Sequence, residues 1–140
     1  LAMRLVPWPT LADELAADWA AGTGGPAPDR LSLYLIWFSR VCEAVGYAHE
    51  RGAVHLDLKP ANVKVHRSGE VQVLDWGLGR GYMPTPDGQT VLFSRSSVEL
   101  DLGPVGHTAE YSPPEQIRGG HPDARMHPRA DVFALGSVLC

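Results

Sequence analysis

Two short runs of β-branched residues, at positions 63–65 and 71–74, most constrain how this 140-residue chain can fold. The residues between them, Arg-Ser-Gly-Glu at positions 67–70, are typical of a turn, so the pattern predicts an antiparallel β-hairpin. Asn62 lies directly before this hairpin and Asp75 directly after it. Because a hairpin brings its own two ends together, we expect Asn62 and Asp75 to face one site.

Helical patterns surround the hairpin. Thr10 followed by Asp13 predicts a capping box at the start of a short helix, which glycines and prolines at positions 22–28 end. Asp29 is the expected cap of a second helix, apolar nearly all round at positions 31–45 and therefore expected to be buried, with Gly52 ending it. A further apolar helix is expected to begin at Asp131.

The remaining segments carry weaker signals. Positions 1–6 indicate a short apolar strand, ended by prolines at positions 7 and 9. No period survives between positions 77 and 127, and a stretch of this length is usually functional or disordered. We expect Trp8, Trp19 and Trp37 to pack in the core or beside the connecting segment.

Charge and composition exclude several classes of protein. A net charge of -4, with no cluster of Lys or Arg, disfavours binding to nucleic acid or to an anionic membrane. No apolar run approaches the roughly 18 residues of a spanning helix, so we expect no membrane contact from this segment. Cys42 and Cys140 cannot form a disulfide framework, which favours a cytoplasmic location. The six histidines lack zinc-site spacing.

Chemistry is concentrated in two polar segments. Positions 55–62 read HLDLKPAN, and positions 75–77 read DWG. Phosphoryl transfer from a nucleotide needs oxygen ligands for a divalent metal, a carboxylate that orients the acceptor hydroxyl, and a cation for the migrating group. Asn62, Asp75, Asp57 and Lys59 are such a set. By contrast, His55 taken alone is better interpreted as a packed core residue than as a catalyst.

These two segments together resemble the catalytic loop and the Asp-Phe-Gly motif of protein kinases. Three further matches follow the order of that family: positions 108–115 (TAEYSPPE) resemble the end of the activation segment, positions 131–136 (DVFALG) the next helix, and positions 1–6 the strand before the hinge. The resemblance covers nearly the whole chain. It implies an α+β, protein-kinase-like fold, mostly the helical C-terminal lobe with a short β-hairpin, in which residues 1–9 are the hinge region and residues 10–140 an incomplete C-terminal lobe.

The resemblance also implies roles in catalysis. Asp57 is the expected catalytic base, Lys59 the contact to the transferred phosphate, and Asn62 and Asp75 the ligands of Mg²⁺, or of Mn²⁺, that accompanies ATP. Thr108 is expected to position Asp57 and Lys59. A lysine two residues after the catalytic aspartate is similar to serine/threonine kinases of the bacterial type, so the implied partner is a protein with a serine or threonine acceptor.

Further residues are implied at the nucleotide site. Met3 matches the gatekeeper position, the backbone of Arg4 through Val6 is expected to meet the adenine edge, and Lys64 lies where the family usually has an apolar floor. Asp131 is expected to brace the catalytic-loop backbone near His55.

The chain departs from the family pattern at several positions. Leu56 replaces the arginine that in many kinases receives a phosphate on the activation loop. Trp76 replaces phenylalanine, Pro113 replaces alanine, and His107 stands where glycine is common.

The two ends of the chain predict that it is part of a longer domain. The chain opens on Leu1 without methionine and stops at Cys140 inside an apolar run, so we expect the domain to continue in both directions. The glycine-rich loop, the strand lysine and most of the N-terminal lobe are then expected outside this segment, and the segment alone is expected to be inactive. Two hypotheses remain for the full-length protein, an active kinase and a pseudokinase that regulates or binds. A metal-dependent phosphohydrolase is a distant third.

Overall fold

The computed structural model describes residues 6–22, 26–76, 80–84, 90–93, 109–117 and 127–139. The chain forms two compact units, one of Leu1–Ala44 with Pro60–Leu74 (unit 1) and one of Val45–Lys59 with Asp75–Cys140 (unit 2). Met3, Arg4, His107 and Thr108 lie outside the described residues, as does most of the strand expected at positions 1–6.

Unit 1 begins with helix α1, Leu11–Ala20. The expected capping box is confirmed: the Thr10 backbone N–H donates to Asp13 Oδ2 (2.8 Å), and the Asp13 N–H donates to Thr10 Oγ1 (3.1 Å). The helix ends before Gly22, which adopts a left-handed φ of 73°. The sequence therefore predicted both ends of this helix.

Helix α2, Pro28–Glu50, starts in unit 1 and ends in unit 2. Asp29 was expected to cap it but lies inside its first turn, because the helix begins at Pro28, whose fixed φ suits the first helical position. The expected end is confirmed, since Gly52 has a φ of 72° and its N–H donates to the His49 carbonyl (2.9 Å). A carboxylate in the first turn still favours the helix through its dipole.

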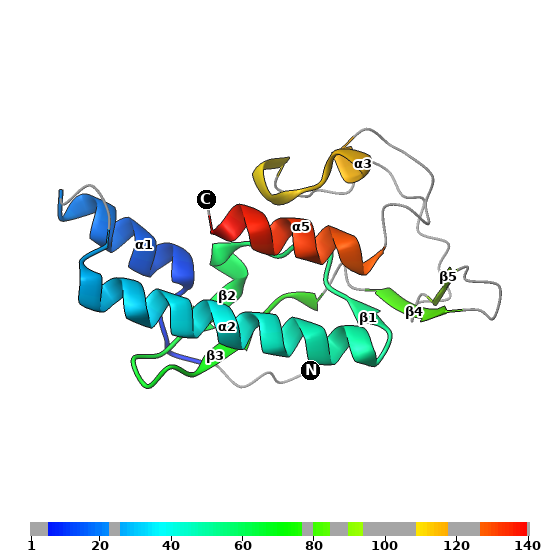
Figure 1. Cartoon of the computed structure of the whole chain (residues 1–140), viewed down its shortest axis with the longest axis horizontal. Helices are drawn as coiled ribbons and strands as arrows, with labels where there is room; N and C mark the ends of the chain where they lie inside the picture. The colour runs from blue at the N-terminus through cyan, green and yellow to red at the C-terminus, as the bar shows by residue number, and fades with distance from the viewer. Residues whose placement is uncertain are drawn as a thin grey trace. The chain divides into compact units, whose positions relative to one another are not determined.

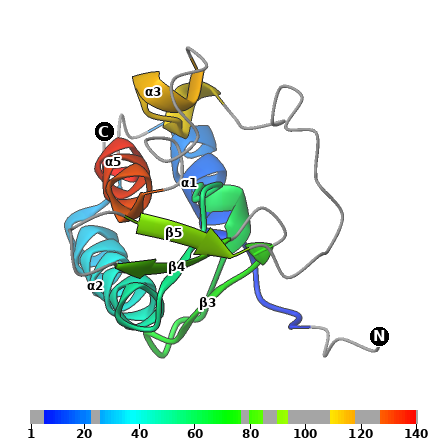
Figure 2. The ribbon, with the colours of Figure 1, turned by 90° about the vertical axis from the view of Figure 1, so that its right-hand side faces the viewer.

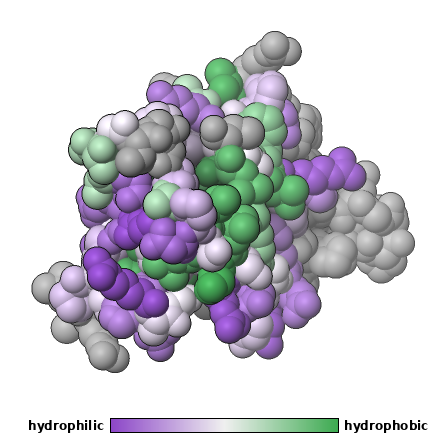
Figure 3. All heavy atoms as spheres, turned by 60° about the vertical axis from the view of Figure 1, so that its left-hand side comes forward, coloured by the Kyte–Doolittle hydropathy of each residue, from purple (hydrophilic) through white to green (hydrophobic). Residues whose placement is uncertain are grey.

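The apolar side chains of α2 are not buried all round, which corrects the sequence-based expectation. Trp37, Val41 and Val45 are buried, whereas Leu31, Leu35 and Ile36 are 49–55% exposed. Trp19 on α1, expected in the packing, is likewise 66% exposed. Hydrophobic side chains are visible at the surface in Figure 3. Composition gave the apolar character of this helix, but only tertiary packing decides which stripe is covered.

The predicted hairpin is confirmed in unit 1. Strand β2, Val63–Val65, pairs antiparallel with β3, Val71–Val73, placing Lys64 opposite Gln72 (Figure 1). Gly69 in the turn has a φ of 89°, which favours glycine. At the open end the Leu74 N–H donates to the Asn62 carbonyl (2.8 Å), so the two ends of the hairpin meet as expected.

Unit 2 contains a three-stranded antiparallel sheet that the sequence did not reveal. Its strands are β1 (Ala53–Val54), β4 (Arg80–Pro84) and β5 (Thr90–Phe93), in the order β1-β4-β5. Figure 2 shows β4 and β5 side by side. Val54 pairs with Arg80, and Tyr82 with Leu92. The glycine and proline in β4 hide any alternation of apolar and polar residues.

Helix α5, Pro128–Val138, is the main helix at the C-terminal end of unit 2. It begins before the expected Asp131, because His127 caps it and Pro128 follows at the first position. Shorter elements are η1 (Pro60–Asn62), η3 (Ala109–Tyr111) and α3 (Pro114–Ile117). Among the described residues, no helix is both long and apolar enough to span a membrane.

Candidate active site

Asp131 on α5 anchors the segment that carries the predicted catalytic residues. Its side chain is fully buried, with Oδ2 accepting the backbone N–H of His55 (2.8 Å) and Oδ1 that of Leu56 (2.8 Å). Bonds between an ionised acceptor and backbone donors are about twice as strong as neutral ones. The expectation that Asp131 braces this loop near His55 is therefore confirmed.

The braced loop has an unusual backbone. Leu56 adopts a φ of 70°, in the left-handed region that costs a non-glycine residue roughly 1–2 kcal/mol. Such conformations persist only where surrounding contacts determine them, and they gather at functional sites. The Asp131 carboxylate supplies one such contact, and the strained residue directly precedes Asp57.

His49, near the end of α2, adds a third donor to the same carboxylate. Its Nε2 lies 2.8 Å from Asp131 Oδ2, and its side chain is largely buried. Because an ionised carboxylate can only accept, Nε2 carries the proton in this contact. Sequence reasoning missed His49. The available signal was a histidine in the last turn of a helix that leads into a polar loop.

His55 is a packed residue, as expected. It is fully buried, its Nδ1 accepts the backbone N–H of Asp57 (3.2 Å), and its ring lies 4.6 Å from the Trp76 ring at 55°. A bulky ring at position 76 therefore has a partner within unit 2. His55 fixes the backbone of Asp57 from one side while Asp131 fixes the two residues before it.

The predicted base and the predicted cation lie together. Lys59 Nζ donates to Asp57 Oδ2 at 2.8 Å, and the two side chains are 23% and 11% exposed. The loop thus presents a carboxylate and an ammonium group at one place, still partly open to a substrate. An ion pair at this distance holds both side chains in a defined orientation.

The other candidate residues lie in separate parts of the molecule. Asp75, exposed, has a φ of 59° and belongs to unit 2 with Asp57. Asn62 is 8% exposed in η1 and belongs to unit 1, so its convergence with Asp75 stays a prediction. Val6 and Lys64 are half-buried in unit 1. Across the described ranges, no group of three or more His, Cys, Asp or Glu side chains is arranged so that it could hold a metal ion.

Comparison with known proteins agrees with this arrangement. The profile of the protein kinase domain matches residues 32–140. The chain belongs to the protein kinase family. Its mostly helical structure with a small two-stranded sheet is consistent with part of the kinase C-terminal lobe. The matched range includes residues 55–62, whose role as the catalytic loop stays a prediction.

Several bacterial kinases are similar to this chain. Serine/threonine-protein kinase PknB of Mycobacterium leprae is 32% identical over 139 residues, covering 99% of this chain and 19% of that protein. PknB of Mycolicibacterium smegmatis is 35% identical over 117 residues, covering 84% and 16%. Serine/threonine-protein kinase PknD of Protochlamydia amoebophila is 33% identical over 107 residues, covering 73% and 10%. The chain therefore spans less than a fifth of the length of these relatives.

Proposed function

We propose that the full-length protein transfers a phosphoryl group from ATP to serine or threonine hydroxyls of proteins. The observation that carries the proposal is the Asp57–Lys59 pair at 2.8 Å on a loop anchored by Asp131. The similarity to bacterial serine/threonine-protein kinases supports the choice of acceptor. We also propose a cytoplasmic location for this domain, because its two cysteines favour a reducing compartment.

Each member of the pair has its own part in the reaction. The Asp57 carboxylate orients the acceptor hydroxyl and accepts its proton, a contribution that is typically about 10²–10⁴-fold for general base catalysis. The Lys59 ammonium group stabilises negative charge on the migrating phosphoryl group. The 2.8 Å contact keeps the two groups close before substrate arrives, which lowers the entropic cost of alignment.

The candidate metal ligands suit magnesium. The Asn62 amide and the Asp75 carboxylate offer hard oxygen donors of the kind that Mg²⁺ and Mn²⁺ prefer. When bound with ATP, the ion would neutralise phosphate charge. Asn62 and Asp75 would hold it, while Met3, Arg4, Val6 and Lys64 remain the proposed contacts to the nucleotide and Thr108 the proposed support of Asp57 and Lys59.

Two substitutions in the full-length protein test these roles. Asp57→Asn should lower kcat about 10²–10⁴-fold and nearly preserve ATP affinity, since Asp57 acts on the acceptor. Asp75→Asn should weaken magnesium-dependent ATP binding, measured by calorimetry. Equal loss of ATP affinity in both variants would show that the roles are assigned wrongly.

The same two measurements, of ATP binding and of phosphoryl transfer, distinguish an enzyme from a pseudokinase when they are made on the wild-type protein. A wild-type protein that binds ATP with magnesium but transfers no phosphate to any of a panel of serine and threonine peptides would favour a regulatory or binding module. The 140-residue chain by itself provides a negative control, because we propose that the groups completing the nucleotide site lie outside it.

A further inference from the structure

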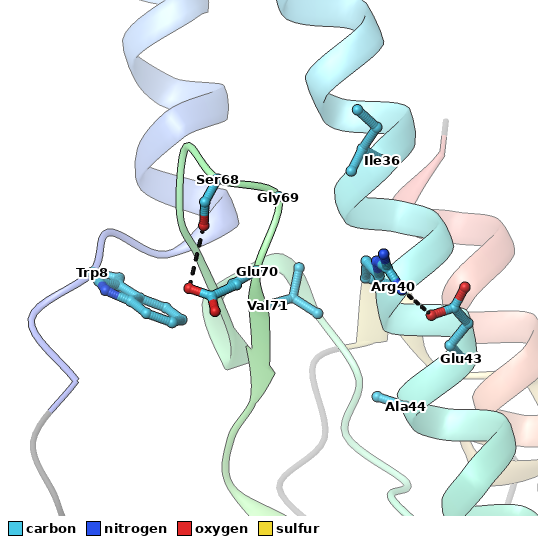
Figure 4. Close-up of a pocket in the computed structure, with 9 residues that line it drawn as sticks. All are labelled: Trp8, Ile36, Arg40, Glu43, Ala44, Ser68, Gly69, Glu70 and Val71. Atoms are coloured by element: carbon cyan, nitrogen blue, oxygen red, sulfur yellow. Dashed lines mark hydrogen bonds and ion pairs between the residues drawn. The ribbon is translucent and has the colours of Figure 1, made fainter.

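Ser68, in the turn of the β2–β3 hairpin, carries an exposed hydroxyl that has no part in the proposed catalytic site. Its Oγ lies 2.7 Å from His66 Nδ1 and donates to Glu70 Oε2 at 3.2 Å, the bond drawn in Figure 4. His66 Nδ1 also accepts the Ser68 backbone N–H at 3.3 Å, which requires this nitrogen to be unprotonated. Both neighbours of the hydroxyl are then acceptors that share its single proton, and neither contact occupies a lone pair of Oγ.

Ser68 differs from the other serines whose side chains the structure describes. Ser32 and Ser137 lie in helices, where each hydroxyl donates to the carbonyl four residues earlier. Ser39 also lies in α2, and Ser112 is buried. Exposed turns open at a much lower free energy than core helices do, and an acceptor must leave its element to enter the site of another molecule. Among these serines, Ser68 is therefore the one most accessible to an enzyme.

The surroundings of Ser68 offer room and positive charge to a phosphate. Ser68 lines a pocket of about 600 Å³ between α2 and the hairpin turn, the volume of roughly 20 waters (Figure 4). Arg40 lines the same pocket, and its bond to Glu43 joins two exposed side chains. A phosphate, with about -1.5 to -2 charge, competes well with one exposed carboxylate for a guanidinium. Arg67, directly before Ser68, is a second cation in the turn.

We propose that Ser68 is a phosphorylation site and that a second copy of the full-length protein modifies it. This inference rests on the proposed serine/threonine kinase activity, which supplies ATP as the donor. A bond forms between Ser68 Oγ and the γ-phosphorus of ATP, the bond from that phosphorus to the bridging oxygen breaks, and ADP leaves. The hydroxyl proton passes to the Asp57 carboxylate of the copy that acts as the enzyme.

The hairpin geometry favours transfer between copies over transfer within one. Asn62, a proposed metal ligand, directly precedes β2, and His66 directly follows it. At about 3.3 Å per residue, the strand separates these two residues by roughly 13 Å. The turn is closed by a bond from the His66 N–H to the Glu70 carbonyl (2.9 Å), which holds it at the far end of the hairpin. Ser68 is thus kept away from Asn62 of its own chain and is presented to another molecule.

Phosphoryl transfer between two forms of the full-length protein tests the proposal. The wild type is the enzyme, and isotope-labelled Asp57→Asn is the acceptor, which lacks the proposed base and so should not modify itself. The two are incubated with ATP and Mg²⁺, digested with trypsin and analysed by mass spectrometry. Circular dichroism verifies that the acceptor is folded, and Lys59→Met provides a second inactive acceptor where Asp57→Asn is not.

The sequence around Ser68 makes the assignment unambiguous. Cleavage after Lys64 or Arg67 and after Arg80 releases Ser68 in a peptide that contains no other serine, threonine or tyrosine. Residues 31–40 of α2, a tryptic peptide with two serines and a tyrosine, are the internal control. On the acceptor, the Ser68 peptide should gain one phosphate at a rate proportional to the wild-type concentration, and the control peptide should gain none.

Three results would overturn the proposal while leaving the kinase activity intact. These are transfer to serine or threonine peptides with Ser68 unmodified, phosphate at Ser68 of the wild type but not of the acceptor, and equal phosphate in the Ser68 and control peptides. Absence of transfer to every acceptor would instead overturn the proposed kinase activity, and this inference with it.

Discussion

The carboxylate Oδ1 of Asp131 lies 2.8 Å from the backbone nitrogen of Leu56 and accepts its hydrogen bond across 75 positions of sequence. Leu56 has a left-handed φ of 70°, and Asp57 follows it directly. The backbone that presents the proposed base is thus held by a buried charge on α5. We therefore expect a change at this contact to affect both the stability of the protein and the proposed catalysis.

Asp131→Asn should therefore damage both properties. The substituted amide can accept at one atom only and presents N–H donors towards groups that also donate, those of His49, His55 and Leu56. We expect the free energy of unfolding to fall by about 2–4 kcal/mol and kcat to fall with it.

Urea denaturation and initial-rate measurements on the full-length protein check this prediction. Val132→Asn, at an exposed neighbouring position, should cost less than about 0.5 kcal/mol and serves as the control. An Asp131→Asn protein with wild-type stability and rate would contradict the anchoring role.

His127 gives α5 a pH-sensitive cap. Burial, followed by electrostatic interaction with Arg129 and His49, lowers the pKa of His127 below its ordinary value. Its Nδ1 accepts the backbone N–H of Arg129 at 3.2 Å, which requires that nitrogen to be unprotonated. A lowered pKa in the folded state means that the unfolded chain binds the proton more readily.

The contribution of His127 to stability should thus be fully present above about pH 6.5 and lost as the pH falls through its lowered folded pKa. His127→Asn retains a good cap that does not titrate, so the difference in unfolding free energy between the two proteins should change by up to about 1 kcal/mol over this window. Denaturation curves from pH 5 to 8 measure it. A constant difference would rule out the titrating cap.

Arg30 connects the two helices of unit 1. Its guanidinium donates to Glu14 Oε2 (2.6 Å) and Asp18 Oδ2 (3.2 Å), and the Tyr34 hydroxyl also donates to Asp18 Oδ2 (2.8 Å). The Glu14 carboxylate, Tyr34 and Asp18 raise the pKa of Arg30, while burial, with Asp18, raises the pKa of Tyr34. This partly buried network binds α1 to α2.

Arg30→Met should consequently lower the free energy of unfolding by about 1–3 kcal/mol, because it leaves two partly buried carboxylates without their cation. Arg40→Met removes an exposed guanidinium with a single partner and should cost less than about 1 kcal/mol. Thermal denaturation of both variants compares the two. Equal losses of unfolding free energy in the two variants would mean that the partial burial of the Arg30 network does not add to stability.

The sequence predicted those elements whose patterns depend on neighbouring residues, and it missed those that depend on contacts with distant residues. The capping box of Thr10 and Asp13 and the turn at Gly69 depend on neighbouring residues, so their patterns predicted α1 and the hairpin. Strands β4 and β5 gave no pattern, because β4 contains glycine and proline and pairs partly with the distant β1. The half-exposed Leu31 and Leu35 show that apolar composition does not specify which face of a helix is covered.

The same distinction holds at the candidate site. The spacing of Asp57 and Lys59 placed them on one loop, and the structure adds that their side chains are in contact. The role of Asp131 was predicted from the resemblance to kinases. No local pattern could connect it to His55, because the two residues are 76 positions apart. His49 was missed because its role exists only through Asp131.

Leu56 occupies the position from which an arginine would receive a regulatory phosphate. A phosphate on an activation loop carries about -1.5 to -2 charge and orders the loop where a guanidinium receives it. Leu56 offers no charge next to Asp57, and its backbone is already held by Asp131. If the full-length protein has the proposed activity, it should therefore keep its active geometry without loop phosphorylation.

Initial rates before and after phosphatase treatment test this independence, and we expect them to be equal. Alanine at Ser94, Ser96 or Ser97 should leave the rate unchanged, whereas Thr108 is examined separately because its proposed contact with Asp57 and Lys59 would affect catalysis directly. Leu56→Arg supplies the missing cation and should make the rate phosphatase-sensitive. A large fall in the wild-type rate after phosphatase, reproduced by one serine variant, would show that another cation, such as Arg80 or Arg95, receives the phosphate.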